Sequence, residues 1–310
     1  MNFPFYIARR YLFSKKKHNA INIISGISVC GVALATLALV CTLSVFNGFQ
    51  DMVASFFTAF DPQLKITVRE GKVFDAQDER IRAVCALPEV EVFTETLEEN
   101  AMVQYKDRQA MVVLKGVEDN FEELTAIDSI LYGAGEFVLH DSIVNYGVMG
   151  VELVATLGTG LEFVDPLQVY LPKRNAKVNM ANPGASFNRD YLYSPGVVFV
   201  VNQQEYDGKY ILTSLDFLRQ LLDYTTEVSA MELKLKSNVN TSSVQSKIEN
   251  ILGDDFVVQN RYQQQADVFR IMEIEKLISY LFLTFILMIA CFNVIGSLSM
   301  LILDKKDDVV

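Results

Sequence analysis

Several residue types and motifs that carry chemistry are rare or missing in this 310-residue chain. It has two histidines and four cysteines, and Cys85 has no cysteine neighbour, so no zinc-binding pattern is present. A G-x-x-x-x-G-K-[ST] phosphate loop is absent, which excludes ATP binding by such a loop. The stretches GAGEF and GTGLEF lack the third glycine of a dinucleotide loop, and no G-x-S-x-G occurs. We therefore expect a protein that is not an enzyme on its own and that holds no cofactor or metal.

Charged residues are missing from two long stretches. No Asp, Glu, Lys or Arg occurs between Asn19 and Gln50 or between Leu277 and Leu303. Each stretch exceeds the roughly 20 residues that a helix needs to cross about 30 Å of hydrocarbon, and a buried core helix is a poor alternative at this length. The sequence therefore predicts two transmembrane helices, at 19–48 and 277–303.

The charges beside the first stretch orient it. Five basic residues precede it and no acidic residue occurs before Asp51, and basic flanks remain in the cytoplasm. Residues 1–18 are thus predicted to form a basic amphipathic cytoplasmic segment, and the chain returns to the cytoplasm at 304–310. The apolar run is longer than the roughly 7–15 residues of a signal peptide, so we expect an uncleaved anchor.

Acidic residues dominate the part of the chain between the two stretches. Residues 47–276 contain 20 basic and 35 acidic side chains, which argues against nucleic-acid binding because nothing neutralises phosphates in bulk. Cys85 is the only cysteine in this part, so no internal disulfide is expected. About 230 residues can supply a core of their own.

Strand and helix patterns alternate without a strict βαβ rhythm in this middle part, which predicts an α+β domain at 49–276. Alternating hydrophobicity predicts strands at LKITV (64–68), at AMVQY and MVVLKGV as a hairpin, and at MELKLK (231–236). In the last of these, Met231, Leu233 and Leu235 are expected to face inward and Glu232 outward. Helices are expected at 75–87, 214–223 and 240–251, and at 262–276 running into the second span.

An apolar stripe follows the first span. Residues of the stripe recur at intervals of three and four along FNGFQDMVASFFTAFDP, which predicts that the helix continues until Asp61–Pro62: Phe46, Phe49, Val53, Phe56 and Phe60. Two interpretations remain open. The stripe either packs against the domain or forms an apolar wall near the outer leaflet of the membrane.

A long polar insertion separates the strand-like pieces PLQVYL and VVFVV. It covers Leu171–Gly196 and contains three prolines and two glycines. An unstructured segment of this length in a compact domain is usually functional or disordered, and the sequence does not decide between the two.

Motifs at both ends and in the middle show a family resemblance. Near the N-terminus, Ile27–Ser28, Gly31, Leu43–Val45 and Asn47–Phe49 stand at the positions of the pattern ISxxGxxxGxxxLxxxLSVxNGF. The stretches LKGVEDNF, GVMGVELVATLG and DGKYILTSLDFLRQLL match further parts of the same pattern, and so does the C-terminal segment up to LDKKDDVV. Over its whole length the chain resembles the lipoprotein-releasing permeases of the LolC/LolE family, within the MacB/FtsX-like superfamily.

That resemblance implies a fold and a function. The fold would be a MacB-like periplasmic core between two transmembrane helices. The chain would be an inner-membrane, multi-pass permease subunit of an ABC transporter that extracts lipoproteins from the outer leaflet, with a large domain in the periplasm. Its partners would be a cytoplasmic LolD-like ATPase that binds Mg-ATP, a second permease chain, membrane lipids, the lipoprotein substrate and a LolA-like periplasmic carrier. In the family two more spans follow, so we expect this sequence to be a fragment or truncated form.

The resemblance also suggests three sets of site residues. An acyl-chain cavity would be lined by Phe46, Phe49, Val53, Phe56, Phe282 and Phe285. A hook at 172–195 would hold the carrier with Pro172, Lys173, Arg174, Lys177 and Arg189, although a solvated loop is the alternative. Contact with the ATPase would begin at Asp304, Lys305, Lys306, Asp307 and Asp308.

Two other functions remain alternatives. One is a MacB/FtsX-like permease that transmits force or exports a different cargo. The other is a two-span receptor with a periplasmic sensor domain, which would need a signalling helix pair after the second span. The sequence does not distinguish a LolC-like from a LolE-like role, a homodimer from a heterodimer, or one lipoprotein from another.

Overall fold

The computed structural model describes residues 3, 6, 19–54, 60–174, 183–264 and 266–305. The chain falls into two compact units. One comprises Met1–Ser55 and Asp267–Val310, and the other comprises Phe56–Ala266. We call them the helical unit and the domain.

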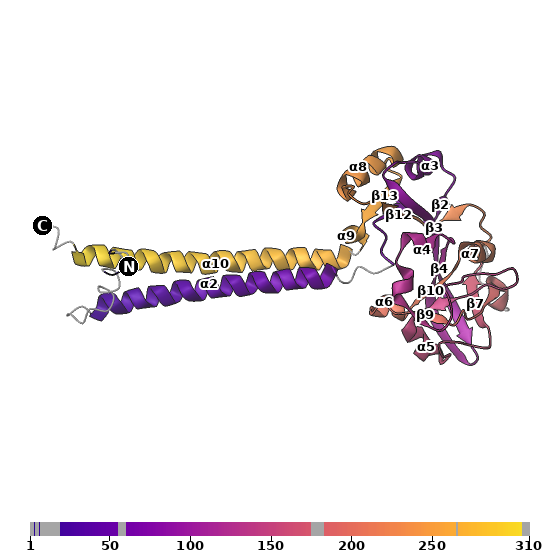
Figure 1. Cartoon of the computed structure of the whole chain (residues 1–310), viewed down its shortest axis with the longest axis horizontal. Helices are drawn as coiled ribbons and strands as arrows, with labels where there is room; N and C mark the ends of the chain where they lie inside the picture. The colour runs from indigo at the N-terminus through magenta and orange to yellow at the C-terminus, as the bar shows by residue number, and fades with distance from the viewer. Residues whose placement is uncertain are drawn as a thin grey trace. The chain divides into compact units, whose positions relative to one another are not determined.

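Two long helices make up the described part of the helical unit. They are α2 (Asn19–Ala54) and α10 (Ala266–Lys305), and they run antiparallel, side by side (Figure 1). The Ser28 hydroxyl on α2 donates a hydrogen bond of 3.1 Å to the backbone oxygen of Asn293 on α10. The stretches Gly26–Gly48 and Ile274–Met300 are long and apolar enough to cross a membrane.

The domain is built on a mixed sheet of nine strands among the described residues. The strands of this sheet are β1 (Leu64–Val68), β3 (Val90–Tyr105), β4 (Arg108–Val117), β6 (Val148–Met149), β7 (Leu167–Pro172), β8 (Phe187–Leu192), β10 (Tyr210–Ser214), β12 (Ala230–Leu235) and β13 (Phe256–Asn260). Two small ribbons are formed by β2 (Phe74–Asp75) with β11 (Glu227–Val228), and by β5 (Leu131–Gly133) with β9 (Val197–Phe199).

Short helices flank these strands. They are α3 (Glu79–Cys85), α4 (Phe121–Leu124), α5 (Val151–Leu157), α6 (Gln204–Asp207), α7 (Leu215–Leu222), α8 (Thr241–Leu252) and α9 (Arg261–Gln264), with 3-10 turns η1 (Ile127–Ile130) and η2 (Pro183–Ser186). Side-chain caps set three of the starts, and at α3 Asp78 accepts from the Arg80 amide. Ser214 accepts from the Phe217 amide at α7, and Asn240 accepts from the amides of Ser242 and Ser243 at α8.

The long strand β3 is central to the sheet, because it pairs with β12, β4 and β7. In the main sheet the strands follow the order β13-β1-β12-β3-β4-β10-β6, and β7 and β8 branch from the end of β3. The first half of β3 pairs with β12 and its far end pairs with β7, while β4 covers Thr96–Tyr105 on the other side. The β4–β10 pair is parallel and the others are antiparallel.

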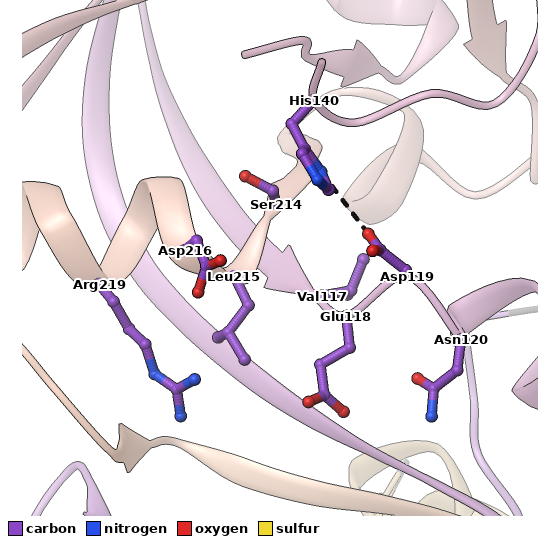
Figure 2. Close-up of a pocket in the computed structure, with 9 residues that line it drawn as sticks. All are labelled: Val117, Glu118, Asp119, Asn120, His140, Ser214, Leu215, Asp216 and Arg219. Atoms are coloured by element: carbon purple, nitrogen blue, oxygen red, sulfur yellow. Dashed lines mark ion pairs between the residues drawn. The ribbon is translucent and has the colours of Figure 1, made fainter. Parts of the chain in front are cut away.

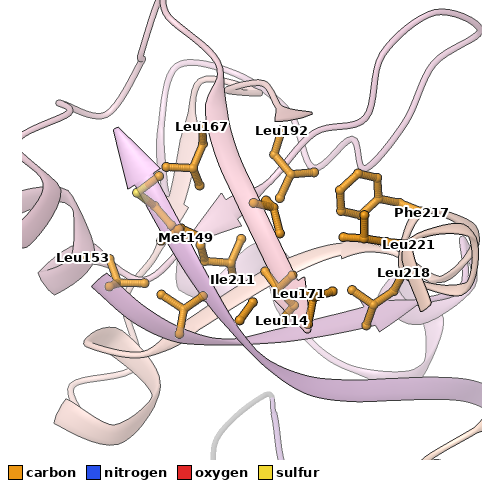
Figure 3. Packing of buried hydrophobic residues seen from close by; sticks show 14 of the residues in the cluster. Leu114, Met149, Leu153, Leu167, Leu171, Leu192, Ile211, Phe217, Leu218 and Leu221 are labelled. Atoms are coloured by element: carbon orange, nitrogen blue, oxygen red, sulfur yellow. The ribbon is translucent and has the colours of Figure 1, made fainter. Parts of the chain in front are cut away.

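Three apolar clusters pack against the sheet around β3. The largest lies between β3, β4, β7 and the helices α5 and α7, where Phe217, Leu218 and Leu221 of α7 reach the sheet (Figure 3). A second packs α3 and α8 onto β1, β12 and β13. A third gathers Phe60, Phe121 and Phe199. Since β3 contributes to the first cluster and borders the second, the two cores share one continuous strand.

Most of the elements expected from the sequence are confirmed. The strand at 64–68 and the helix at 240–251 are present, with α7 covering most of 214–223. The expected hairpin forms around a two-residue turn, and Lys106 in that turn has a positive φ of 53°. The helix expected at 75–87 is shorter and covers only Glu79–Cys85.

Three expectations were wrong. Glu232 does not face solvent: it is completely buried, because the second face of β12 is also covered and because Lys115 pairs with its carboxylate. Phe60 is not on the helix that follows the first span. It lies in a turn and is buried in the domain, in contact with Phe199. The second half of the insertion is not a loop, since Phe187–Leu192 pairs with β7 as a hairpin arm.

Candidate functional site

The two long helices pack along a narrow seam. On α2 the half-buried residues are mostly separated by three or four positions: Ser28, Gly31, Ala35, Ala38, Leu39, Thr42 and Phe46. The matching set on α10 is Ser279, Leu283, Ile286, Ala290 and Asn293. This spacing is that of a left-handed helix pair, and the small residues of α2 allow the backbones to approach closely.

Large apolar side chains cover the rest of both helices. They are exposed in the structure, and more than half of the surface of Leu34, Leu37, Leu281 and Ile289 is accessible. Exposed apolar area of this extent is typical of helices that lie in a membrane or that have further helices packed around them. The pair therefore provides an apolar outer surface along its whole seam-free side.

The predicted acyl-chain residues are spread over this helical unit. Phe46 lies on the seam, and the ammonium group of Lys276 lies 5.8 Å from its ring centroid. Phe282 and Phe285 lie outside the seam and are 63% and 53% exposed. Phe49 and Val53 belong to α2, but their side chains are outside the described residues, as is all of Phe56. The rings of Phe282 and Phe285 are thus accessible for apolar contacts, and their lining of an acyl-chain cavity stays a prediction.

The predicted hook begins and ends on a two-stranded arm. Pro172 is the last residue of β7, and the Lys173 amide donates to the Ser186 carbonyl at 2.9 Å across the start of the loop. The Arg174 guanidinium lies 4.9 Å from the Tyr224 ring centroid and 3.9 Å from Glu227. Lys177 is outside the described residues.

Arg189 belongs to a cross-strand row that the sequence did not reveal. Arg189 lies opposite Tyr170 on β7, Tyr170 lies opposite Met102 on β3, and Met102 lies opposite Met111 on β4. Arg189 and Met111, at the two ends of the row, are exposed, and Tyr170 and Met102 between them are half-buried. Residues that face each other across neighbouring strands share one face of the sheet. This row therefore continues from the base of the insertion across four strands. It could be found only once the pairing was known, because β7 and β3 are far apart in sequence.

The predicted ATPase contact lies at the far end of α10. Asp304 and Lys305 are the last residues of this helix, and their side chains are outside the described residues. Lys306, Asp307 and Asp308 are outside the described residues altogether. The helix α10 thus continues to the first two residues of the predicted contact.

A polar pocket of about 350 Å³ lies beside the N-terminus of α7. Figure 2 shows His140 above Asp119, whose carboxylate is 3.6 Å from the imidazole, while Glu118 and Arg219 extend away from that pair. Arg219 is held by Glu95 at 2.6 Å. Burial, opposed by a backbone hydrogen bond, raises the pKa of Glu118 above its ordinary value. The basic groups here are engaged by carboxylates, so the pocket offers no free anion site.

A cluster of four charges crosses the sheet, and we call it the ion cluster: Lys65, Glu98, Lys115 and Glu232. Lys115 and Glu232 are buried, whereas the side chains of Lys65 and Glu98 are 23% and 22% exposed. The Lys115 ammonium is 2.6 Å from Glu232 and 3.7 Å from Glu98, and Lys65 is 3.2 Å from Glu98. Burial works against ionisation of Glu98, but the two ammonium groups outweigh it and lower the pKa of Glu98 to about 2. Burial likewise opposes the charge of Lys65, yet the neighbouring carboxylates raise its pKa.

Metal binding finds no support in the part of the chain that the structure describes. No group of three or more His, Cys, Asp or Glu side chains there could hold a metal ion. Cys85 lines a cavity of about 510 Å³, but burial and the charges of Glu95 and Glu118 raise the pKa of its thiol to about 11. The thiol is therefore protonated and a poor ligand or nucleophile at neutral pH.

The chain is similar in sequence to one family profile and to several known proteins. The profile of the MacB-like periplasmic core domain matches residues 25–251. The lipoprotein-releasing system transmembrane protein LolE of Haemophilus influenzae is 23% identical over 100% of this chain and 73% of its own length. LolC of Neisseria meningitidis is 24% identical over 98% of this chain and 72% of its own. The periplasmic region of MacB from Actinobacillus actinomycetemcomitans aligns with 66% of this chain and 91% of its own at a TM-score of 0.44 and 10% identity.

Proposed function

This chain belongs to the family with a MacB-like periplasmic core domain, and from that membership we propose that it is a permease subunit of an ABC transporter that extracts lipoproteins from the inner membrane. The observation that carries the proposal is the match of essentially the whole chain, helices included, to proteins named as lipoprotein-releasing permeases. Hydrolysis of ATP belongs to a separate cytoplasmic subunit, and a second permease chain completes the assembly.

The proposed topology places α2 and α10 across the inner membrane and the domain in the periplasm. The two apolar stretches have the length required to span a bilayer. Their seam uses small residues and one asparagine, which is how helices associate in lipid, where apolar burial alone does not drive association. Basic residues before α2 support a cytoplasmic N-terminus.

Lipid extraction needs both work and an apolar receiving surface. Burial of an acyl chain contributes about 0.8 kcal/mol per CH₂ group, so removing several chains from a bilayer costs tens of kcal/mol. The coupled ATPase supplies the work. Phe282 and Phe285, exposed on α10 outside the seam, offer ring surfaces to the acyl chains, together with Phe46, Phe49, Val53 and Phe56.

The periplasmic carrier is proposed to bind at the arm formed by β7 and β8. Lys173 and Arg189 are exposed there, and the row from Arg189 to Met111 adds aromatic and thioether surface beside them. A basic island on an otherwise acidic domain favours an acidic partner surface. The residues Asp304–Asp308 are proposed to start the contact with the ATPase.

Photo-crosslinking tests the extraction step. A photoreactive amino acid at Phe282, in the assembled transporter in membranes, is expected to capture a lipidated precursor. The matched control is Phe292, also exposed on α10 and about 15 Å farther along the helix, which is expected to capture far less. Addition of ATP and the carrier before irradiation should lower the yield of the cross-link at Phe282, because the cargo has then been released.

Two results would redirect the assignment. Capture of a non-lipidated cargo at Phe282 would favour export of another substrate by a MacB-like permease. Equal capture at Phe282 and Phe292, with no response to ATP, would mean that both positions contact bulk lipid and that Phe282 does not line a cargo cavity.

A further inference from the structure

The chain enters and leaves the domain at one place. The leading segment (Phe60–Pro62) and the trailing segment (α9, Arg261–Gln264) are joined directly: Arg261 Nε donates to the Asp61 carbonyl at 3.0 Å, and Gln264 Nε2 donates to the Pro62 carbonyl at 3.1 Å. The strands that follow and precede them are also paired, with Leu64 opposite Asn260. Any displacement of one segment is therefore shared by the other.

Side chains of the leading segment reach into the domain. Phe60 is 3% exposed, and its ring centroid lies 4.7 Å from that of Phe199 and 5.1 Å from that of Tyr206. The Tyr206 hydroxyl donates to Asp61 at 3.1 Å. The leading segment is thus held by α6 and β9 as well as by its own strand.

The ion cluster lies directly beneath this segment. Its members come from four adjacent strands in sheet order: Lys65 from β1, Glu232 from β12, Glu98 from β3 and Lys115 from β4. The Lys115 ammonium lies 5.9 Å from the Phe60 ring centroid and 5.6 Å from that of Phe121. Charge pairing therefore connects the first strand of the domain to the strands at its centre.

The pairing of β1 with the centre of the sheet is short. It pairs with β12 only at Leu64–Leu233, Lys65–Glu232 and Ile66–Met231. On its other side β1 pairs along its whole length, Leu64–Val68, with β13, which is the edge strand of the sheet. A pull on the leading and trailing segments acts on β1 and β13 together, and the load passes to the rest of the sheet between β1 and β12. Backbone pairs there are few, so the Lys65–Glu98 ion pair, which reaches from β1 past β12 to β3, carries a large share.

Buried charges are a costly way to gain stability. Taking ions out of water costs several kcal/mol each, and replacement of a buried pair by apolar residues is often neutral or stabilising. A specific ion pair nevertheless helps to define register, because a shift of β1 by one residue would turn Lys65 to the other face of the sheet, away from Glu98. The cluster is therefore better suited to resisting sliding of β1 than to adding stability.

We propose that the ion cluster and the docked leading segment form a force-transmitting joint, which holds β1 in register while the helices that precede and follow the domain in sequence move. The inference rests on the proposed function only for the source of the movement. The joint itself is a property of the domain and has a readout of its own.

Hydrogen exchange in the full-length assembled protein tests the joint. The double variant Lys65→Met with Glu98→Leu removes the ion pair that reaches from β1 to β3 and nearly keeps its volume, while Lys115 and Glu232 remain paired with each other. The expected result is a thermal unfolding temperature close to that of the wild type, with amide exchange in β1 and β13 faster by about tenfold or more and exchange in β7 and α7 unchanged. Unchanged exchange in β1, or an equal acceleration throughout the domain, would overturn the proposal.

A second variant avoids the risk of misfolding. Tyr206→Phe removes only the hydroxyl that holds Asp61, and the matched control is Tyr191→Phe at an exposed position of β8. Faster exchange in β1 is expected for Tyr206→Phe and not for Tyr191→Phe. The same response to both variants would contradict the role of the leading segment.

A covalent bypass separates the mechanical role from the transport function. Ile66 and Met231 lie directly opposite each other, a placement that suits a disulfide between antiparallel strands. If Ile66→Cys with Met231→Cys restores cargo release to the Lys65→Met, Glu98→Leu protein under oxidising conditions, the joint is mechanical. Slow exchange without restored release would contradict the proposal, whereas a wild-type protein that releases no lipoprotein would refute the proposed function and leave the exchange test standing.

Discussion

Gly31 of α2 faces the side-chain amide of Asn293 on α10, and a Cβ atom built at Gly31 would lie only 3.1 Å from Asn293 Nδ2. Even a methyl group at this position would require the Asn293 side chain to shift. Ser28, one turn away, donates to the backbone of the same Asn293. Together these contacts set the register of the two helices.

Substitution of Gly31→Leu is expected to separate the helices at this point, because overpacking a tight contact costs about 1–3 kcal/mol. The measurement is disulfide formation between Thr42→Cys and Ser279→Cys, two seam positions, in a background without native cysteines. Gly26→Leu is the matched control, since nothing lies within 4 Å of a Cβ at Gly26. Undiminished cross-linking in the Gly31→Leu protein would show that the seam does not depend on this contact.

Acid should weaken the domain through Glu98. Its folded-state pKa of about 2 is below the ordinary 4.5, so the stabilisation is complete above pH 4.5 and is lost as the pH falls from 4.5 toward 2. The shift corresponds to about 3 kcal/mol. Urea unfolding of the full chain between pH 6 and pH 2.5 is expected to show this loss in the wild type and a flatter curve in Glu98→Gln. The exposed Glu70→Gln should follow the wild type, and identical slopes in all three proteins would rule out the assignment.

The Cys85 thiol should react slowly despite its position beside a cavity. With a pKa of about 11, its thiolate fraction at pH 8 is about two hundredfold below that of an ordinary thiol. Alkylation by iodoacetamide, followed by mass spectrometry of the native and the urea-unfolded chain, measures the difference. Modification of native Cys85 at the unfolded rate would contradict the expected protection.

Arg189 and Arg174 should contribute unequally to carrier binding. Arg174 already packs on Tyr224 and approaches Glu227, whereas Arg189 is exposed in the row beside Tyr170. Arg189→Glu is expected to weaken the carrier complex by about tenfold or more, and Arg174→Glu by less. Binding is measured by titration of the purified carrier, with the exposed Arg82→Glu on α3 as control, and equal effects of Arg189→Glu and Arg82→Glu would mean a non-specific charge effect.

Sequence periodicity predicted the elements whose burial follows one simple pattern. Alternation at Leu64–Val68 gave a strand with Leu64 and Ile66 inside, and the cap at Asn240 marked the start of α8. Local signals suffice in such cases because each residue is buried or exposed by its own element. The two helices were predicted for the same reason, as their length and lack of charge are local properties.

Long-range pairing explains what periodicity did not predict. Glu232 reads as a solvent-facing residue, and only the approach of Lys115 from β4, 117 positions away in sequence, makes its burial possible. Phe60 fitted the helical stripe, but the aromatic side chains of β9 and α6 bury it instead.

The pairing of β1 has a consequence for biosynthesis. Its partners on either side, β12 and β13, begin roughly 170 and 190 residues later in the chain. At about 5–20 residues per second, the ribosome finishes Leu64 on the order of 10 to 30 s before Leu233 exists. During that interval an apolar strand stays without its neighbours, which makes the nascent chain a client for holding factors and puts closure of the sheet among the last steps of folding.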